Sequence, residues 1–372
     1  MTGPVGVALT GAGDVSAQYL ESLLGYPDVA VVGVADLDVE RARAVASAHG
    51  IGFGGSLADL LDRDEVELVV NITVPAAHAE VALAAIAAGR HVWGEKPLAL
   101  DRSSARSVLD AAAAAGVAVG NAPDTILGTA IQNSQRLLAD GLIGTPLTVL
   151  TLMQGPGPER WHPRPQFLFA RGAGPLFDIG PYYVTTLVQL LGPVSSVSAT
   201  GNRARASRVI GSGPLAGTRF GVEVDTHVSV LTRFASGVVG TSVYSFDSPV
   251  RRQAFEVTGE HGTMEVPVSG FDGPTRVLRD DPAVPDGDWE TLLAPADKRS
   301  RGVGVLEMAR AIRAGRAPRA SGELAYHVLD VLLAIEESAA RGGAPVAVRS
   351  STGAVPLLEP DWSASANTLG AQ

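Results

Sequence analysis

The sequence predicts an α/β protein with two domains: a doubly wound parallel sheet, and then an α+β domain with an open, mostly antiparallel β-sheet. Three observations lead to this expectation. The chain has 372 residues, which exceeds the usual size of one hydrophobic core. Its first third alternates short apolar strand patterns with helical patterns, as in sheets built from β-α-β crossovers. Between residues 194 and 266, strand patterns follow each other through connections too short for helices.

The composition is that of a globular chain, and it excludes several classes of protein. A formal net charge of −10 at pH 7 and scattered basic residues argue against a nucleic-acid partner. The absence of cysteine excludes disulfides, thiolate catalysis and cysteine metal sites, and it fits a reducing cytoplasm. The seven histidines show no metal-binding spacing, so we expect no metal. No signal peptide or membrane span is visible. We therefore expect a cytoplasmic protein without a membrane partner.

The chain begins with a strand, a glycine-rich turn and a helix. Residues 5–10 are apolar and β-branched, and they lead into the G-x-G-x-x-S segment Gly11 to Ser16 and a helical pattern that runs to residue 24. The first glycine permits the tight turn, and the second lets the backbone approach a pyrophosphate at the helix N-terminus. The candidate cofactor contacts in this turn are Gly11, Gly13, Asp14 and Val15.

The second strand pattern, residues 29–35, ends at Asp36. This carboxylate follows the turn by about 20 residues, where a dinucleotide-binding domain holds the ribose hydroxyls. A carboxylate repels a 2′-phosphate, so we expect NAD, although Arg41 and Arg43 leave NADP open as an alternative. The structural alternative for Asp36 is an N-cap of the helix that starts at Val39.

The alternation continues as far as residue 120. Helices are expected at 41–49, 56–61, 76–88 and 101–116, and strands at 66–73, 91–93 and 117–120. Ligands of such sheets bind beyond the carboxyl ends of the strands. The residues that fall at these ends, and that we expect to converge, are Gly11, Asp36, Thr73, Glu95 and Asn121.

These motifs resemble those of the glucose–fructose oxidoreductase, inositol dehydrogenase and rhizopine-catabolism (Gfo/Idh/MocA) family. The resemblance covers most of the chain and rests on the segments Gly11 to Ser16, Thr73 to His78, Gly89 to Pro97 and Gly174 to Gly180. It implies a Rossmann domain and NAD(P)-dependent oxidation of a sugar, polyol or related ring alcohol. It also implies cofactor contacts near the nicotinamide at Thr73, Pro75 and His78, with Glu95 and Lys96 alongside.

Lys96, in the Glu-Lys-Pro segment, is the expected main acid–base group. The resemblance places the matching lysine against the reacting hydroxyl and the nicotinamide ribose. A lysine has a reference pKa of ~10.4, which is too high for a base at neutral pH, but burial and a nicotinamide cation would lower it. The alternative interpretation is a surface ion pair between Glu95 and Lys96. Adjacent strand residues point to opposite faces, which argues against this alternative.

We expect a dinucleotide-binding domain at residues 1–122 and a substrate-binding domain at 123–372. Whether the final helices pack back on the first domain is left open. The second domain is expected to contain helices at 126–140, 176–191, 305–314 and 323–341, and strands at 148–154, 194–200, 226–235, 238–246, 253–258 and 263–266. The resemblance implies a homodimer or homotetramer formed through its sheet.

Asp178 and Tyr182 are four residues apart, so on one helix they share a face. A cap carboxylate and a core tyrosine are the structural alternative. The family commonly has Asp-x-x-x-His here, and the resemblance implies a role in proton transfer. Because Tyr182 replaces the histidine and has a reference pKa near ~10, we expect Lys96 to carry more of the proton transfer. Pro181, inside the expected helix, would bend it.

Three further residues are candidates for substrate binding. Asp124 follows the last strand of the first domain, and a carboxylate there can hold sugar hydroxyls or an amine. Trp161 can stack on an apolar sugar face, and His162 can bind a hydroxyl group. Packing within the loop is the structural alternative for Trp161 and His162.

The expected function is an NAD(P)-dependent oxidoreductase that moves a hydride between nicotinamide and a secondary hydroxyl or ketone of a sugar, glycoside or cyclitol. One alternative keeps the enzyme but gives it a non-sugar ring diol, ketone or imine. Another is a cofactor-sensing regulatory protein without turnover, against which the intact Glu-Lys-Pro segment argues.

Overall fold

The computed structural model describes residues 3–268, 270–280, 282–283, 287–295 and 297–370. The chain forms two compact units. The first comprises Met1–Gln132, Pro295–Leu329 and Val355–Gln372, and the second comprises Asn133–Ala294 and Asp330–Ala354. The expected boundary at residues 122 and 123 therefore lies within the first unit. Helix α9 (Val303–Arg313) also belongs to the first unit. The sequence had left open whether a late helix packs with the first domain in this way.

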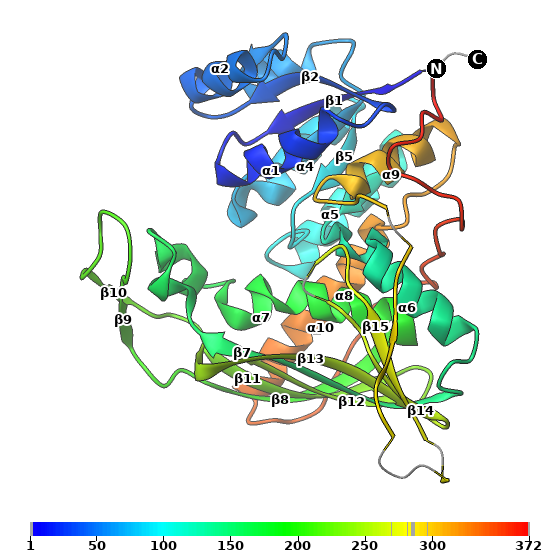
Figure 1. Ribbon diagram of the computed structural model, residues 1–372. Coiled ribbons are helices and arrows are strands. Elements are labelled where there is room, and N and C mark those ends of the chain that lie inside the picture. Colours follow the sequence, from blue (N-terminus) through cyan, green and yellow to red (C-terminus); the bar gives the residue numbers. More distant parts are fainter. Residues whose placement is uncertain (1–2, 269, 281, 284–286, 296, 371–372) are drawn as a thin grey trace. The chain divides into compact units, whose positions relative to one another are not determined.

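The first unit is organised around a six-stranded sheet in which all neighbouring strands are parallel (Figure 1). The strands, in the spatial order of the sheet, are β3 (Gly54–Gly55), β2 (Val29–Ala35), β1 (Val5–Thr10), β4 (Leu68–Asn71), β5 (His91–Gly94) and β6 (Val119–Asn121). The strand order reverses between β1 and β4, and doubly wound sheets bind their ligands beyond the strand ends at this point. The predicted doubly wound parallel sheet is confirmed.

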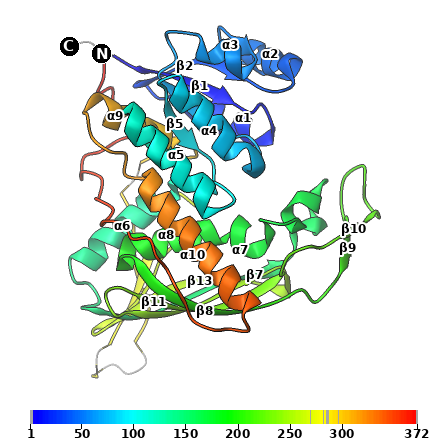
Figure 2. The same ribbon diagram turned by 180° about the vertical axis from the view of Figure 1, so that it is seen from behind.

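Helices cover both faces of this sheet, which explains why β1 and β4 are buried along their whole length. Helices α4 and α5 pack together on one face, and α1 and α9 on the other (Figure 2). The helices of this part are α1 (Asp14–Leu23), α2 (Val39–Ala48), α3 (Leu57–Leu61), α4 (His78–Ala87) and α5 (Arg102–Ala115), with short 3-10 turns η1 (Pro75–Ala77) and η2 (Asp124–Leu127). The side chains of Asp38, Ser56 and Asp101 cap α2, α3 and α5.

The second unit contains a nine-stranded sheet in which every neighbouring pair is antiparallel except β7 and β12. Its strands, in spatial order, are β16 (Glu290–Leu292), β15 (Thr275–Arg279), β14 (Gly262–Glu265), β13 (Asp247–Gly259), β7 (Pro146–Pro156), β12 (Val239–Ser245), β11 (His227–Phe234), β8 (Val194–Asn202) and β17 (Val346–Ala347). This confirms the predicted mostly antiparallel sheet. The short strands β15, β16 and β17 and the hairpin β9 (Ser207–Val209) and β10 (Arg219–Gly221) were not predicted.

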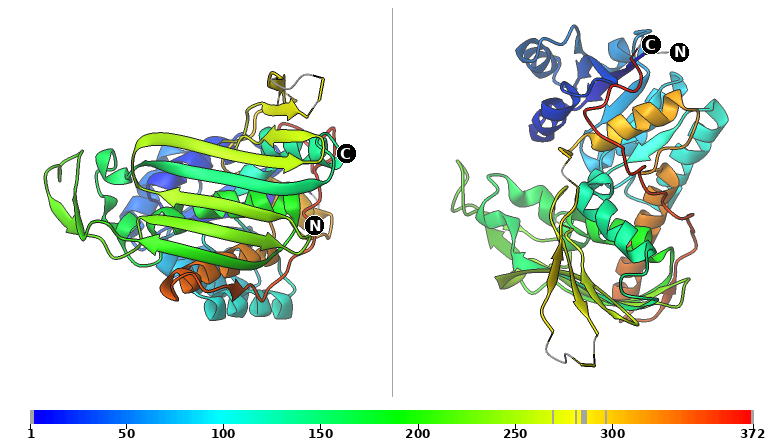
Figure 3. Two further views of the ribbon diagram at one scale, coloured as in Figure 1. Left: turned by 90° about the horizontal axis from the view of Figure 1, so that it is seen from below. Right: turned by 45° about the vertical axis from the view of Figure 1, so that its right-hand side comes forward.

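One face of the nine-stranded sheet is covered by helices, and the other is open (Figure 3). The helices of the covered face include α7 (Gly174–Asp178) and α8 (Gly180–Leu191), while α6 (Thr129–Ala139) and α10 (Gly322–Ala340) extend beyond this unit. Leu150, Thr241 and Leu231 are register neighbours on β7, β12 and β11, and all three are exposed. The open face therefore presents apolar side chains across several strands.

The predicted single helix at 176–191 is wrong. The structure has two helices, and Ile179 separates them. Pro181 lies in the first turn of α8, where a missing N–H group costs no helical hydrogen bond, so the chain starts a new helix there rather than bending an old one. Asp178 thus ends α7 while Tyr182 lies in the first turn of α8, and the argument from a shared helix face no longer applies.

No helix within the described residues is long and apolar enough to cross a membrane.

Candidate active site

The glycine-rich turn follows β1 and fits closely against β4. Gly11 has a φ of +107°, and a Cβ atom added there would lie 2.7 Å from the carbonyl oxygen of Ile72. Gly13 precedes α1 with open space around its Cα, and no side chain caps this helix. A side chain at Gly11 would thus be obstructed, and the turn leads to a helix N-terminus without a side-chain cap. Such a turn suits a pyrophosphate group.

Asp36 lies at the end of β2 and faces this turn. Its Oδ2 accepts the main-chain N–H of Ala12 at 2.7 Å, and its Oδ1 accepts hydrogen bonds from the N–H of Asp38 and from the guanidinium of Arg41. Burial alone would raise the pKa of Asp36, but these donors outweigh it and hold the pKa below its ordinary value. The N-cap of α2 is Asp38, so the alternative that made Asp36 a helix cap is wrong.

His78 joins the loop after β4 to the loop after β5. Its Nδ1 lies 2.6 Å from the carbonyl oxygen of Pro97, and its Nε2 lies 3.1 Å from that of Thr73. The ring is buried, and both nitrogens face main-chain oxygens. The structure therefore gives His78 a task in holding two loops together, while Thr73 and Pro75 keep partly or fully exposed surface at the strand end. Direct cofactor contacts by these residues stay predictions.

Glu95 is the centre of a buried hydrogen-bond network. Its Oε1 accepts from the phenol of Tyr19 at 2.9 Å and from Nη1 of Arg301 at 2.8 Å. Its Oε2 accepts the main-chain N–H of Lys96 at 3.1 Å, and the carbonyl oxygen of Glu95 accepts from the side-chain amide of Asn121. The Lys96–Pro97 peptide bond is cis. The half-buried Lys96 thus follows a residue whose carboxylate is fixed on both oxygens.

The sequence predicted a role for Glu95 but missed Tyr19 and Arg301. Tyr19 lies on α1, less than one helical turn beyond the Gly11 to Ser16 segment, and its place in the apolar pattern indicates only a core residue. Arg301 is 206 residues from Glu95 in the chain, so no local pattern connects them.

Asp124 lies on η2, where its carboxylate is 2% exposed. Its Oδ2 accepts the main-chain N–H groups of Gly302 and Gly304 at 2.8 and 3.2 Å, at the start of α9. Burial raises the pKa of Asp124 from its ordinary value of 3.8 to about 6. The carboxylate is turned towards α9, so the structure favours a capping role over the predicted contact with a substrate.

The second unit carries the remaining predicted residues. Asp178 and Tyr182 are half-buried on either side of the break between α7 and α8. Trp161 is 62% exposed, and its ring contacts the edge of His162, which in turn contacts Phe167, with ring centroids 5.5 and 5.4 Å apart. Trp161 and Phe167 are exposed at the two ends of this row, and His162 between them is half-buried.

The loop that carries this row is anchored by Arg208. Its guanidinium pairs with Glu159 at 2.7 Å and with Asp247, and it lies over the ring of Phe169. Both carboxylates therefore share one buried guanidinium.

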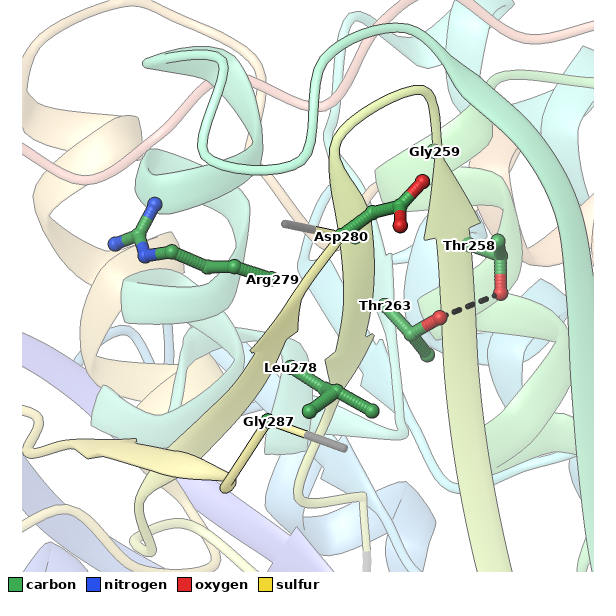
Figure 4. A pocket seen from close by; sticks show the side chains of 8 residues that line it. Thr258, Gly259, Thr263, Leu278, Arg279, Asp280 and Gly287 are labelled. Atoms are coloured by element: carbon green, nitrogen blue, oxygen red, sulfur yellow. Dashed lines mark hydrogen bonds between the residues drawn. The ribbon is translucent and has the colours of Figure 1, made fainter. Parts of the chain in front are cut away.

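A pocket at the tips of β13, β14 and β15 is not part of this site (Figure 4). In it the hydroxyl groups of Thr258 and Thr263 bond to each other at 3.0 Å, and Arg279 points away from them. The lining contains none of the predicted site residues. No cluster of three or more His, Asp or Glu side chains able to hold a metal was found in the part of the chain that the structure describes.

Two family models match most of the chain. Residues 5–122 match the oxidoreductase family with an NAD-binding Rossmann fold, and residues 131–265 match the GFO/IDH/MocA C-terminal domain. Together they span more than half of the sequence.

Individual proteins agree with these matches. A 1,5-anhydro-D-fructose reductase from Ensifer adhaerens is 27% identical over 350 residues, which are 90% of this chain and 96% of that protein. A levoglucosan dehydrogenase from Pseudarthrobacter phenanthrenivorans is 27% identical over 242 residues, 59% of this chain and 61% of that protein. A solved structure of levoglucosan dehydrogenase in complex with NADH and L-sorbose superposes with a TM-score of 0.82 at 23% identity. It covers 94% of this chain and 100% of that one. At this identity the structural likeness shows the shared fold.

Proposed function

The chain belongs to the GFO/IDH/MocA family of NAD-binding oxidoreductases, and from this premise we propose that it transfers a hydride between NAD and a secondary hydroxyl or ketone of a sugar, glycoside or cyclitol. One observation supports this most directly. Strands β1, β4 and β5 are neighbours in a parallel sheet, so the glycine-rich turn, the Thr73 loop and Lys96 leave it at the same edge.

The residues of the first unit fit a dinucleotide. Gly11 admits no side chain, Gly13 has open space above it, and α1 has no side-chain cap, which together leave room and donors for a pyrophosphate. Asp36 is the residue we propose to hold the adenosine ribose. Its ionised carboxylate and its bond to the turn favour NAD over NADP.

Lys96 is the proposed acid–base group. When bound, NAD supplies the hydride acceptor. Lys96 Nζ takes the hydroxyl proton as the alcohol becomes a ketone, and it returns a proton in the reverse direction. Of the 29 basic lysine and arginine residues, only Lys96 and Lys298 are lysines. An arginine at this position could not lose its proton at neutral pH, whereas a lysine can be brought into range.

Residues of the second unit complete the proposal on the basis of the family resemblance. Asp178 and Tyr182 are proposed to assist proton transfer, with the Tyr182 hydroxyl donating to the substrate oxygen. Trp161 and His162 are proposed substrate contacts, because the exposed ring of Trp161 and the half-buried ring of His162 match the alternating apolar and polar surface of a sugar. Asp124 is left out of this set because its carboxylate is buried at the start of α9.

We further propose that the open face of the nine-stranded sheet pairs two or four copies of the chain. Exposed Leu150 and Leu231 lie on this face with Thr241 between them in register, and apolar surface of this kind is typical of subunit contacts.

The test is a screen for NADH formation over sugars, glycosides and inositols, with non-sugar ring diols as a separate panel. We expect turnover with a secondary alcohol of the first group and none with Lys96→Ala. Tight NADH binding without turnover on any panel would contradict the proposal and favour the regulatory alternative.

A further inference from the structure

The buried cluster around Glu95 contains an arginine to which the proposed reaction assigns no task. Arg301 and Tyr19 donate to the same oxygen of Glu95, and the other oxygen accepts the main-chain N–H of Lys96. Glu95 is 8% exposed, so its charge is poorly solvated. A buried carboxylate requires a cation or several donors, and here it has both.

Tyr19 strengthens this arrangement by remaining a donor. Burial, followed by the negative charge of Glu95, raises the pKa of Tyr19 well above its ordinary value, so the phenol stays protonated. The indole N–H of Trp93 donates to the phenol oxygen at 3.2 Å and so fixes its orientation. The phenol donor on Glu95 is therefore held in place.

The segment before α9 positions Arg301 beside Glu95. Its carbonyl oxygen accepts from the hydroxyl of Ser22 on α1, and the next N–H, of Gly302, donates to Asp124. Gly302 has a φ of +101°, and a Cβ atom there would lie 2.7 Å from the Ser22 hydroxyl. A Cβ atom at Gly304 would lie 2.0 Å from the ring of Trp93. The segment can approach α1 and β5 this closely only with glycine at both positions.

Titratable groups reach Glu95 from several packed elements. Tyr19 comes from α1, Arg301 from the segment before α9, and Asp124 from η2, where the charges of Arg301 and Glu95 both act on it. Lys96 follows directly in the chain. Arg301 forms an ion pair with this carboxylate at 2.8 Å.

We propose that Arg301 is a positioning residue for Lys96: through Glu95 it fixes the main chain of Lys96, and it balances a negative charge that would otherwise favour the ammonium form of the lysine. This inference rests on the proposed role of Lys96. It assigns a functional task to a residue that lies 206 residues from Glu95 in the chain.

The composition of the chain allows a direct test that needs no substrate. Lys96 and Lys298 are the only lysines, and Lys298 is exposed, so it serves as a reference amine in the same molecule. The rate of reductive methylation of each amine by formaldehyde and borohydride can be followed by peptide mass spectrometry as a function of pH. The midpoint of this profile reports the charge state of Lys96.

Arg301→Gln should raise the Lys96 midpoint by roughly 0.5 to 1 pH unit, since the carboxylate then acts on Lys96 unbalanced. Glu95→Gln should lower it, and the double variant should resemble Glu95→Gln, because Arg301 acts through Glu95. Lys298 should not change in any variant. If Arg301→Gln does not fold, Arg301→Lys, which keeps the charge, should retain the wild-type midpoint while Glu95→Gln still lowers it.

Arg299→Gln is the matched control. Arg299 lies two residues away and binds Asp297 and the carbonyl oxygens of Leu127 and Trp362. Its loss should leave the Lys96 midpoint unchanged. Equal midpoints in wild type, Arg301→Gln and Glu95→Gln would overturn the inference. Absence of turnover in the substrate screen would instead refute the proposed function, and the two failures are separable because methylation requires no turnover.

Discussion

The carboxylate of Asp36 accepts the main-chain N–H of Ala12 at 2.7 Å. This bond joins the end of β2 to the glycine-rich turn after β1, so the proposed ribose contact and the proposed pyrophosphate contact are positioned together. A change at Asp36 should therefore affect the cofactor more than the fold.

Asp36→Asn should weaken NADH binding about tenfold, because a hydrogen bond to a charged acceptor is lost. It should also improve NADPH binding, since the 2′-phosphate is no longer repelled and Arg41 is released from its ion pair. Fluorescence titration with both cofactors measures this. Asp38→Asn, which changes only the cap of α2, is the control, and a wild type that prefers NADPH would contradict the assignment.

Lys96→Arg should lower kcat by roughly a hundredfold to ten-thousandfold while NADH affinity stays within a few-fold of wild type. The guanidinium keeps the positive charge but cannot exchange a proton at neutral pH. Steady-state kinetics on the substrate found in the screen measure the loss. Lys298→Arg makes the same substitution at the exposed lysine and should keep full activity. An active Lys96→Arg enzyme would refute the acid–base role.

Tyr182→Phe should reduce kcat about tenfold to a hundredfold with a smaller effect on KM, if its hydroxyl donates to the developing alkoxide. Tyr183→Phe, at the adjacent position, removes a hydroxyl whose bond is to the carbonyl oxygen of Leu152, and it should leave kcat close to wild type. Unchanged kcat in Tyr182→Phe would remove this residue from the proposed site.

Asp124 should make stability fall as pH rises between about 4 and about 6. Its folded-state pKa is raised from 3.8 to about 6, so across this range the unfolded chain releases the proton and the folded chain retains it. Asp124→Asn keeps an oxygen for the N–H groups of Gly302 and Gly304 and should flatten this part of the profile. Denaturant unfolding at a series of pH values measures it. Wild type and Asp124→Asn with parallel profiles would show that Asp124 does not titrate in this range.

Leu231→Glu should convert the proposed dimer or tetramer to smaller species, because a charge would be buried on the proposed pairing face. Leu231 is 61% exposed on the open face of the nine-stranded sheet. Analytical ultracentrifugation at micromolar protein concentration measures the change. Leu24→Glu, at a 49% exposed leucine of the first unit, is the control. A monomeric wild type would contradict this interface.

Much of the first unit could be predicted because its signals are local. Apolar β-branched runs of strand length, such as residues 5–10, bury on both faces of a parallel sheet, and the glycines at 11 and 13 mark the turn directly. The predicted helix limits were less accurate at places where a single residue decides the limit. Asp38 rather than Asp36 caps α2, and Pro181 opens a helix rather than bending one.

The candidate residues at the strand ends could be predicted from the sequence. The residues that form hydrogen bonds with them could not. His78 could be identified from its motif, yet only the structure shows that both of its ring nitrogens face the carbonyl oxygens of Thr73 and Pro97. Asp124 was expected to face a substrate, and it lies under α9 instead. The partner groups in these cases come from segments that no short pattern connects.

The sequence by itself determined the parallel sheet, the glycine-rich turn, the position of Asp36 and the Glu-Lys-Pro segment, because strand periodicity and turn chemistry depend on neighbouring residues. Only the tertiary structure decided that Arg301 and Tyr19 meet on Glu95 and that Asp124 holds the start of α9. Arg301 reaches Glu95 across 206 residues of chain, and it does so only because glycines at 302 and 304 let the start of α9 pack directly against Ser22 and Trp93.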